Sequence, residues 1–265
     1  MVFQPSCRAP VLMGIRAIWA KNAGVRMIEF ENTALILTAR MAGQPLHGRP
    51  ILDVNGKPLI LASLENARNA KLGHVMVAAG ENSIAEVVRD DGGDAMVASA
   101  QLAGETDQVA ALLKLRDPQR RFEHVVILPS AFVTIEALAL RRCLAGLLNR
   151  DVDAATLAAA MPEADQTSIG IVAPLEGERE LAYVRDFTIP PKTSPFKHIP
   201  IYAYRRAALE RFASLPPDPR EKQGGPEGLR ALFHGLRMVA VKVDTAPFSV
   251  DTPEDLETLR RLLKA

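Results

Sequence analysis

The chain has 265 residues, enough for one large domain or for one domain with a sub-domain. A hydrophobic fraction of 48% with 24% charged residues is ordinary for a globular protein that buries a sizeable core. The formal net charge of +1 gives no electrostatic reason to expect nucleic acid or a membrane as the main partner, and no apolar run approaches the roughly 18 residues of a membrane span.

Cysteine and histidine usage narrows the chemistry further. The two cysteines, Cys7 and Cys143, lie far apart and outside any metal-binding spacing. This pattern predicts a reducing, cytoplasmic environment with neither a disulfide framework nor a thiolate metal site. The five histidines have no metal-ligand spacing either, which disfavours a zinc site.

The first 26 residues carry four basic side chains and no acidic one. Their apolar piece, from Val11 to Ala20, is interrupted by Arg16, whereas a secretory signal needs an unbroken apolar core. We therefore interpret residues 1–26 as an N-terminal extension, or as the product of a mis-assigned start upstream of Met27, and expect it to be largely disordered. Residues 27–265 are predicted to form a single domain.

The stretch from residue 35 to residue 60 changes character twice. A strand-like run (33–37) breaks into a loop rich in Arg, Gly, Pro and His, and helical spacing begins after Pro58. A buried strand, a basic loop and a helix start are how α/β folds build phosphate sites at the carboxyl end of a strand. The same composition also fits a plain connection with incidental basic residues, in which Lys57 would be a turn lysine that orients the helix.

Strands and helices then alternate along the chain. The predicted helices are 58–71, 83–90 with Asn82 or Ser83 as N-cap, 106–115, and 134–148 with Thr134 as N-cap. The predicted strands are 74–79, 94–98 and 125–128. This order predicts an α/β fold with a mostly parallel sheet flanked by helices, whose ligands bind outside the carboxyl ends of the strands.

From about residue 151 to 205 the pattern becomes β-rich. Strand-like runs follow one another without a helix, at 154–160, 169–173, 181–185 and 199–204. This predicts a β-rich insertion that could serve as a lid or a dimer surface. Helices at 206–212 and 227–234, a strand at 238–243 and a terminal helix follow. The terminal helix has Thr252 as its predicted N-cap and Pro253 at its first position.

Four segments carry a family resemblance: Ala39-Arg40, LDVNGKPLI (52–60), HIPIYAYRRAALERF (198–212) and SVDTPEDLE (249–257). In this order they resemble the CMP-Kdo synthetases, or 3-deoxy-manno-octulosonate (Kdo) cytidylyltransferases, over about residues 36–263. These enzymes couple CTP to an eight-carbon acidic sugar before lipopolysaccharide assembly. The resemblance implies a Rossmann-like nucleotidyltransferase fold, Mg²⁺-dependent attack of a sugar hydroxyl on the α-phosphorus of CTP, and a homodimer.

The resemblance also assigns site residues by position. Arg40 and Arg49 are implied to be the catalytic phosphate cations. Asp251 is implied to hold Mg²⁺, and His198 matches a family residue near the sugar carboxylate. The implied nucleotide-binding residues are Thr38, Ala39, Arg40, Arg49 and Thr106, and the implied sugar-binding residues are His198, Tyr202 and Glu227.

The chain departs from the family pattern at four positions. Pro45 stands where the family has a second loop arginine, and Ala131 stands where it has a metal-binding Asp. A methyl group cannot coordinate Mg²⁺, which prefers oxygen ligands. Gln108 replaces an arginine, and Gly228 replaces the Gln of a sugar-binding Glu-Gln pair.

These departures leave two hypotheses open. The first is a CTP-dependent cytidylyltransferase acting on Kdo or a related acidic sugar. The second is a catalytically impaired member that binds nucleotide or a protein partner. An acid such as Glu105 or Asp107 near Ala131 would favour the first, and Phe132 filling that space would favour the second. Two residues also have purely structural interpretations: Asp251 could cap the terminal helix, and His198 could simply bond to backbone at a strand edge.

Overall fold

The computed structural model describes residues 28, 30–41, 46–98, 102, 104–162, 168–177, 179–188 and 194–264. The predicted N-terminal extension, Cys7 and Pro45 lie outside these residues. The α-helices of the described part are α2 Leu59–Asn69, α3 Asn82–Asp90, α4 Glu105–Arg116, α5 Ala137–Ala145, α6 Arg206–Ala213, α7 Gly228–Phe233 and α8 Pro253–Leu262. Short 3₁₀ turns lie at Phe30–Asn32, Arg49–Ile51, Gly146–Leu148 and Glu221–Gln223.

Twelve strands accompany them. They are β1 Thr33–Ala39, β2 Asp53–Val54, β3 Lys57–Pro58, β4 His74–Ala79, β5 Ala95–Val97, β6 His124–Pro129, β7 Ala154–Ala160, β8 Gly170–Val172, β9 Leu181–Tyr183, β10 Asp186–Thr188, β11 Phe196–Arg205 and β12 Met238–Lys242. The strands β2 and β3 form a separate hairpin. Its turn residues, Asn55 and Gly56, both have positive φ, as an Asn-Gly hairpin turn requires.

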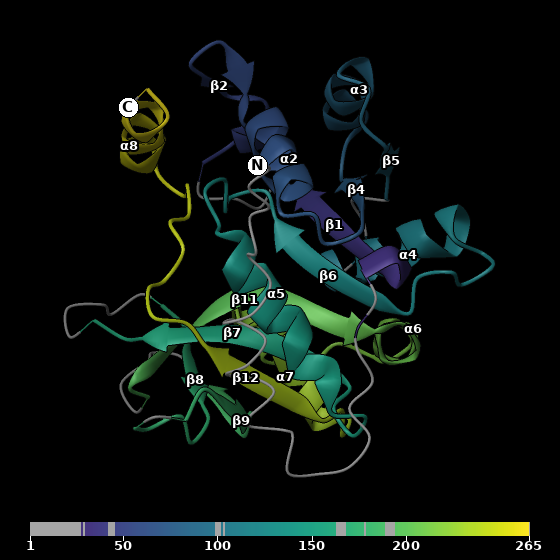
Figure 1. Cartoon of the computed structure of the whole chain (residues 1–265), viewed down its shortest axis with the longest axis vertical. Coiled ribbons are helices and arrows are strands. Elements are labelled where there is room, and N and C mark those ends of the chain that lie inside the picture. The colour runs from purple at the N-terminus through teal and green to yellow at the C-terminus, as the bar shows by residue number, and fades with distance from the viewer. Residues whose placement is uncertain are drawn as a thin grey trace, which may run out of the picture.

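The main sheet has the strand order β5-β4-β1-β6-β11-β7-β12-β9, with β8 and β10 branching from β11. The pairs β4–β5, β1–β4, β1–β6 and β7–β12 are parallel, whereas β11 is antiparallel to both β6 and β7. Six of the eight strands on the path therefore run in one direction, and only β11 and β9 oppose them. This confirms the predicted α/β class with a mostly parallel sheet. Figure 1 shows the sheet extending from β4 and β1, near α2 and α3, to β12 and β9.

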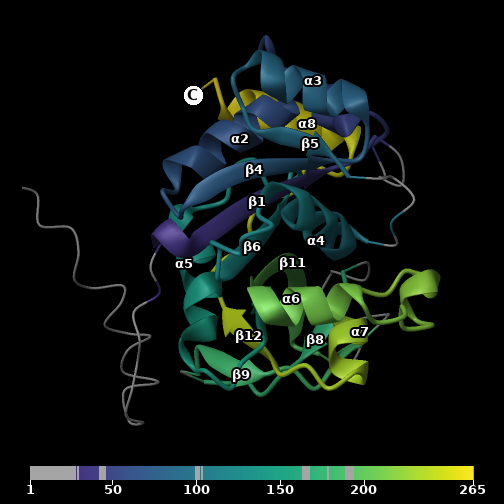
Figure 2. The same cartoon turned by 90° about the vertical axis from the view of Figure 1, so that its right-hand side faces the viewer.

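Helices cover both faces of the sheet, so the central strands are buried on two sides. Along β1, Leu35 and Leu37 pack into the core under α2, α3 and α5, while Ala34 and Ile36 pack into the core under α4, α6 and α7. All seven residues of β1 are buried, which is why its sequence is apolar without alternation. Figure 2 shows α4, α6 and α7 on the face turned toward the viewer.

A third, smaller core joins α8 to the β2–β3 hairpin and the start of α2. It consists of Val54, Leu59, Val133, Val250, Leu256 and Leu259. Through it the C-terminal helix is attached beside the loop that follows β1, as the upper part of Figure 1 shows. This contact brings residues near 50 and near 250 into one neighbourhood.

The segment from 151 to 205 contains strands and, in its described part, no helix, as predicted. Two of its strands, β7 and β11, lie within the main sheet between β6 and β12. The short strand β10 was absent from the prediction. The strand β11 is irregular: its register against β7 shifts between Ile199 and Tyr202, with Pro200 inside the shift.

Two predicted helix starts are wrong, and a third is confirmed. The N-cap of α3 is Glu81, one residue before Asn82, and α5 begins at Ala137 rather than after Thr134. The Ile135 carbonyl accepts from the Asn66 side chain at 2.8 Å, a bond made outside the helix, which begins two residues later. Thr252 does cap α8, in a capping box with Asp255. None of the described helices is long and apolar enough to cross a bilayer.

Candidate active site

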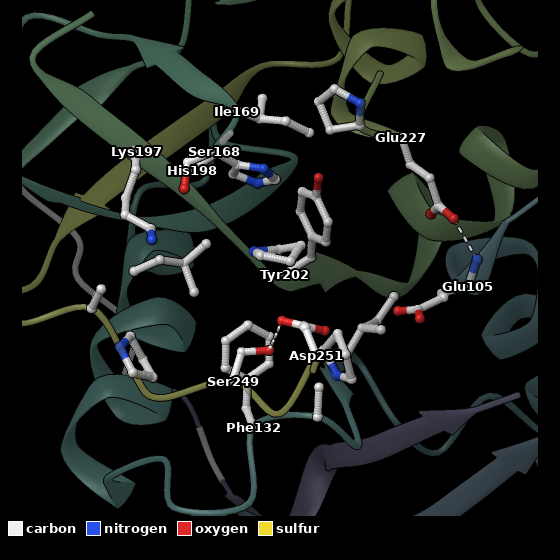
Figure 3. Close-up of a pocket in the computed structure, with 18 of the residues that line it drawn as sticks. Glu105, Phe132, Ser168, Ile169, Lys197, His198, Tyr202, Glu227, Ser249 and Asp251 are labelled. Atoms are coloured by element: carbon white, nitrogen blue, oxygen red, sulfur yellow. Dashed lines mark hydrogen bonds between the residues drawn. The ribbon is translucent and has the colours of Figure 1, made fainter. Parts of the chain in front are cut away.

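A cavity of about 440 Å³ opens at the carboxyl end of β6, where β11 enters the sheet. Its walls come from segments far apart in sequence: the end of β6, the start of α4, the first half of β11, the start of α7 and the loop before α8. Six of the predicted site residues line it together: Arg49, Thr106, His198, Tyr202, Glu227 and Asp251. Figure 3 shows Asp251 opposite Tyr202 across this space.

The other predicted nucleotide-binding residues lie beside the cavity without lining it. Thr38 and Ala39 end β1 and are buried. The Thr38 hydroxyl donates to the Glu105 carboxylate at 2.9 Å, which connects β1 to the cavity wall. Arg40 follows directly and donates to the Leu102 carbonyl at 3.3 Å. The structure thus places the end of β1 behind the cavity.

Arg49 and Asp251 form an ion pair at the cavity wall. The Arg49 Nη1 lies 2.6 Å from Asp251 Oδ1 and also donates to the Val250 carbonyl at 2.8 Å. The Arg49 side chain is only 4% exposed, whereas that of Asp251 is 46% exposed. Burial lowers the pKa of Arg49, and the nearby Asp251 charge opposes that shift. The second carboxylate oxygen of Asp251 accepts from the Ser249 hydroxyl at 2.6 Å.

The start of α4 holds the Glu227 carboxylate. Both the Glu105 and Thr106 backbone N–H groups donate to it, the latter at 2.9 Å, so Glu227 satisfies donors that every helix N-terminus leaves free. A side chain at Gly104 would overlap Glu227 Oε1 in its present position, so glycine leaves room for this approach. Burial raises the pKa of Glu227 to about 7, and the Glu105 charge adds to the rise.

Glu105 is the second buried acid of this wall. Burial raises its pKa, against the lowering effects of the Thr38 hydrogen bond and the charges of Arg40 and Arg49. Figure 3 shows the carboxylates of Glu105 and Glu227 on the same side of the cavity. The wall therefore carries two carboxyl groups whose ionisation burial disfavours.

Aromatic rings form the part of the wall that His198 and Tyr202 contribute. The His198 ring contacts Phe187 edge-on, with centroids 4.9 Å apart, and lies 5.4 Å from the Tyr202 ring. Burial lowers the pKa of His198 to about 3 and raises that of Tyr202 well above its usual range. A side chain at Gly228 would meet the Phe187 ring at 2.6 Å, so Phe187 occupies the space that a larger residue there would need.

Comparison with known proteins decides the family. A cytidylyltransferase family model matches residues 34–263. The chain belongs to the cytidylyltransferase family. The resemblance found in the sequence motifs is therefore confirmed.

Individual relatives agree with this placement. The 3-deoxy-manno-octulosonate cytidylyltransferase of Rhodopseudomonas palustris (strain BisB5) is 41% identical over 239 residues, covering 87% of this chain and 97% of the relative. The enzyme of the same name from Bradyrhizobium sp. (strain BTAi1) is 42% identical over 236 residues, covering 86% and 96%. A solved structure of CMP:2-keto-3-deoxy-manno-octonic acid synthetase complexed with CTP matches with a TM-score of 0.76 at 25% identity, covering 88% of this chain and 98% of that chain.

The cytidylyltransferase fold also permits a test of the implied metal. In the described part of the chain, no group of three or more His, Cys, Asp or Glu side chains could hold a metal ion. Asp251 supplies one carboxylate, and both its oxygens already accept hydrogen bonds. Because Mg²⁺ commonly binds one or two carboxylates together with substrate phosphates, this donor set fits an ion shared with a triphosphate. It does not fit an ion held by the protein alone.

Two of the residues that the sequence offered as discriminators, Phe132 and Glu105, line the cavity together with Ala131. Asp107 does not, because Arg230 binds it at 2.8 Å. Lys57 lies away from the cavity and pairs with Glu65 at 2.6 Å, as expected for a turn lysine that orients α2.

Sequence reasoning missed two residues that line this site, Lys197 and Ser249, and also Phe187, which contacts the His198 ring. Lys197 and His198 both line the cavity although they are neighbours on one strand. A regular strand points such neighbours to opposite faces, and the register shift of β11 comes after both of them, between Ile199 and Tyr202, so strand alternation alone would have assigned only one of them to the cavity. Phe187 lies on β10, a strand too short to show a pattern.

Proposed function

We propose that this protein transfers a cytidylyl group from CTP to Kdo or a related acidic sugar in the biosynthesis of lipopolysaccharide or another surface polysaccharide. The observation that carries the proposal is the convergence of Arg49, His198, Tyr202, Glu227 and Asp251 on one cavity, in a chain 41% identical to relatives of that name. A sugar hydroxyl oxygen forms a bond to the α-phosphorus of CTP. The bond from that phosphorus to the bridging oxygen breaks, and pyrophosphate leaves with the electron pair.

In this proposal, residues at and near the end of β1 bind the phosphates of CTP. Arg49 lines the cavity, and its buried Nε has no hydrogen-bond partner among the described residues, so this guanidinium retains a donor for a phosphate oxygen. Arg40 adds a second cation behind it. Positive charge placed where the leaving pyrophosphate gains charge stabilises the transition state. Thr38, Ala39 and Thr106 supply the adjoining surface.

Asp251 is the proposed protein ligand of Mg²⁺. When bound, the ion would neutralise phosphate charge and orient the α-phosphate toward the sugar hydroxyl. Asp251 must then exchange its ion pair with Arg49 for the metal, which frees the guanidinium for the triphosphate.

The sugar half falls to His198, Tyr202 and Glu227. These residues line the wall opposite Asp251, and their rings and carboxylate are held by β11 and by the start of α4. A polyhydroxylated sugar placed between the two walls would find hydrogen-bonding groups on one side and phosphate-binding groups on the other.

A second candidate is an impaired family member that binds nucleotide or a protein partner without turnover. The observation that favours it is the methyl group of Ala131 in the cavity wall, where the family pattern has a carboxylate, with Phe132 beside it. Without that carboxylate, Asp251 is the metal-binding carboxylate that the motif resemblance still assigns to the proposed site.

One assay separates the two candidates. Pyrophosphate release from CTP is measured with Mg²⁺ and Kdo, for the unmodified protein and for an Ala131→Asp variant, and CTP binding is measured by calorimetry. Turnover by the unmodified protein supports the transferase. Turnover by the variant alone establishes an impaired site. No turnover in either protein, together with no CTP binding, would sink the cytidylyltransferase proposal.

We further propose that residues 27–265 act as one domain in a cytoplasmic homodimer. The core under α2, α3 and α5 includes residues from β1 through β12, so the described chain shares one interior from residue 35 to residue 243. Light scattering on the purified protein tests the dimer: a mass near one chain would contradict it.

A further inference from the structure

The irregularity of β11 gathers three groups around one hydroxyl. Between Ile199 and Tyr202 the register against β7 shifts, and the carbonyls of Ile199 and Ile201 both lie within reach of Thr156 Oγ1, at 3.1 and 3.0 Å. The Nε2 of His198 lies 3.0 Å from the same oxygen. Thr156 is fully buried on β7, and His198 is 5% exposed.

The protons available around Thr156 Oγ1 decide whether Nε2 of His198 is protonated. A threonine hydroxyl has one proton to donate, and a carbonyl oxygen can only accept. If the proton goes to a carbonyl, the hydroxyl oxygen can bond to His198 only when Nε2 carries a proton. If it went to Nε2 instead, two carbonyl oxygens would face a bare oxygen at 3.0–3.1 Å. Only the first arrangement makes two hydrogen bonds.

We propose that Thr156 is a positioning residue that holds His198 as the neutral Nε2–H tautomer, so that Nδ1 accepts a hydrogen bond from a hydroxyl group of the bound sugar. The hydrogen bond to Thr156 uses Nε2, so Nδ1 is the ring nitrogen left for a ligand, and the ring lines the cavity. Figure 3 shows the His198 ring beside Tyr202 at that wall. The identity of the ligand rests on the function proposed above, whereas the tautomer does not.

If His198 is the Nε2–H tautomer, different residues must bind the hydroxyl groups and the carboxylate of the sugar. A carboxylate offers only lone pairs, which a neutral Nδ1 lone pair repels, so His198 is suited to a hydroxyl and unsuited to the sugar carboxylate. The burial that lowers the pKa of His198 to about 3 keeps the ring neutral at physiological pH. The cationic side chains that line the cavity, Arg49 and Lys197, are the groups suited to a carboxylate.

The first test is spectroscopic and independent of turnover. Long-range ¹H–¹⁵N spectra of ¹⁵N-histidine-labelled protein at pH 7, assigned with a His198→Gln variant, report which ring nitrogen carries the proton. We expect a protonated Nε2 and a free Nδ1 for His198 in the unmodified protein and in Thr156→Ser. An Nδ1–H tautomer or an imidazolium would overturn the proposal. Because the unmodified protein decides the point, the proposal stays testable even where a variant fails to fold.

The second test is kinetic. Thr156→Val keeps the shape of the side chain and removes the hydroxyl, and Thr156→Ser keeps the hydroxyl. We expect Thr156→Val to raise KM for Kdo about tenfold, since one neutral hydrogen bond is lost, with kcat and KM for CTP within about twofold. Thr156→Ser should match the unmodified protein. A Thr156→Val variant with unchanged KM for Kdo overturns the positioning role. Absence of turnover throughout bears on the proposed function and leaves the tautomer to the spectra.

Discussion

The proposed sugar side and the proposed phosphate side of the cavity are built differently. On the sugar side (His198, Tyr202 and Glu227), the polar groups of His198 and Glu227 are held by the scaffold: Thr156 of the neighbouring strand holds His198, and the backbone of α4 holds Glu227. On the phosphate side (Arg40, Arg49 and Asp251), the two groups that line the cavity, Arg49 and Asp251, are held by each other. The sugar side is preorganised before a ligand arrives, whereas the phosphate side must break an ion pair to bind one.

Two of the departures from the family pattern, Ala131 and Gly228, lie on different sides of the cavity. Ala131 lies on the phosphate side, next to the self-paired charges. Gly228 lies on the sugar side, but there Phe187 fills the space, so the wall stays packed. The space left at Gly228 is filled by the Phe187 ring, whereas Ala131 brings only a methyl group to the cavity wall where the family pattern has a carboxylate.

Removing Arg49 is expected to have the largest effect on activity. Arg49→Met deletes the cation that lines the cavity and should lower kcat/KM for CTP by about 10²–10³-fold, as loss of a charge-stabilising donor does. CTP binding, followed by calorimetry, should weaken as well. Arg120→Gln is the matched control, because Arg120 forms an exposed pair with Glu210 far from the cavity. Equal effects of the two variants would show that the phosphate side does not depend on Arg49.

A side chain at residue 104 should displace the Glu227 carboxylate from its hydrogen bonds to the backbone of α4. In Gly104→Ala the new methyl group would overlap Glu227 Oε1, forcing the carboxylate away from the α4 N-terminus. We expect a loss of about 2–4 kcal/mol in unfolding free energy, from overpacking and loss of the cap together. Urea denaturation measures it. The control is Gly177→Ala, where the added methyl meets open space and only the positive φ costs about 1 kcal/mol.

The raised pKa of Glu227 predicts a pH dependence of stability with a definite sign. Its pKa is about 7 in the folded protein against 4.5 as the ordinary value, so the folded state binds more protons between these two values. Stability from this group is therefore present below pH 4.5 and is lost as pH rises toward 7, by about 1–3 kcal/mol. Glu227→Gln should flatten that part of the profile in urea denaturation at pH 5, 6 and 7. A variant profile parallel to the original would contradict the assignment.

The sequence predicted the frame of the molecule better than its site. Strands β4 and β7 begin and end at the predicted residues because each is a short, mostly apolar run between turns. The cap of α8 was predictable because Thr252 bonds within its own first turn. The cap of α5 was not, because the hydrogen bond from the Asn66 side chain to the Ile135 carbonyl is a tertiary contact.

The site residues show the same contrast between features set by nearby sequence and features set by tertiary contacts. Motif positions correctly brought Arg49, His198 and Asp251 to one cavity. That Arg49 would bind Asp251 could not be foreseen, since 202 residues separate them and the contact depends on how α8 packs beside α2. The proton on His198 was equally hidden, because it follows from two carbonyl groups turned by a bulge.

The smallest expected effect sharpens the boundary of the phosphate side. Lys57 belongs to the same family motif as its neighbours, yet it forms an exposed ion pair with Glu65 at the start of α2. Lys57→Ala should leave kcat and KM for CTP within about twofold, since exposed pairs contribute little and the side chain does not line the cavity. Steady-state pyrophosphate release measures this directly. A tenfold rise in KM for CTP would mean that the β2–β3 hairpin, which carries Lys57, also contributes to nucleotide binding.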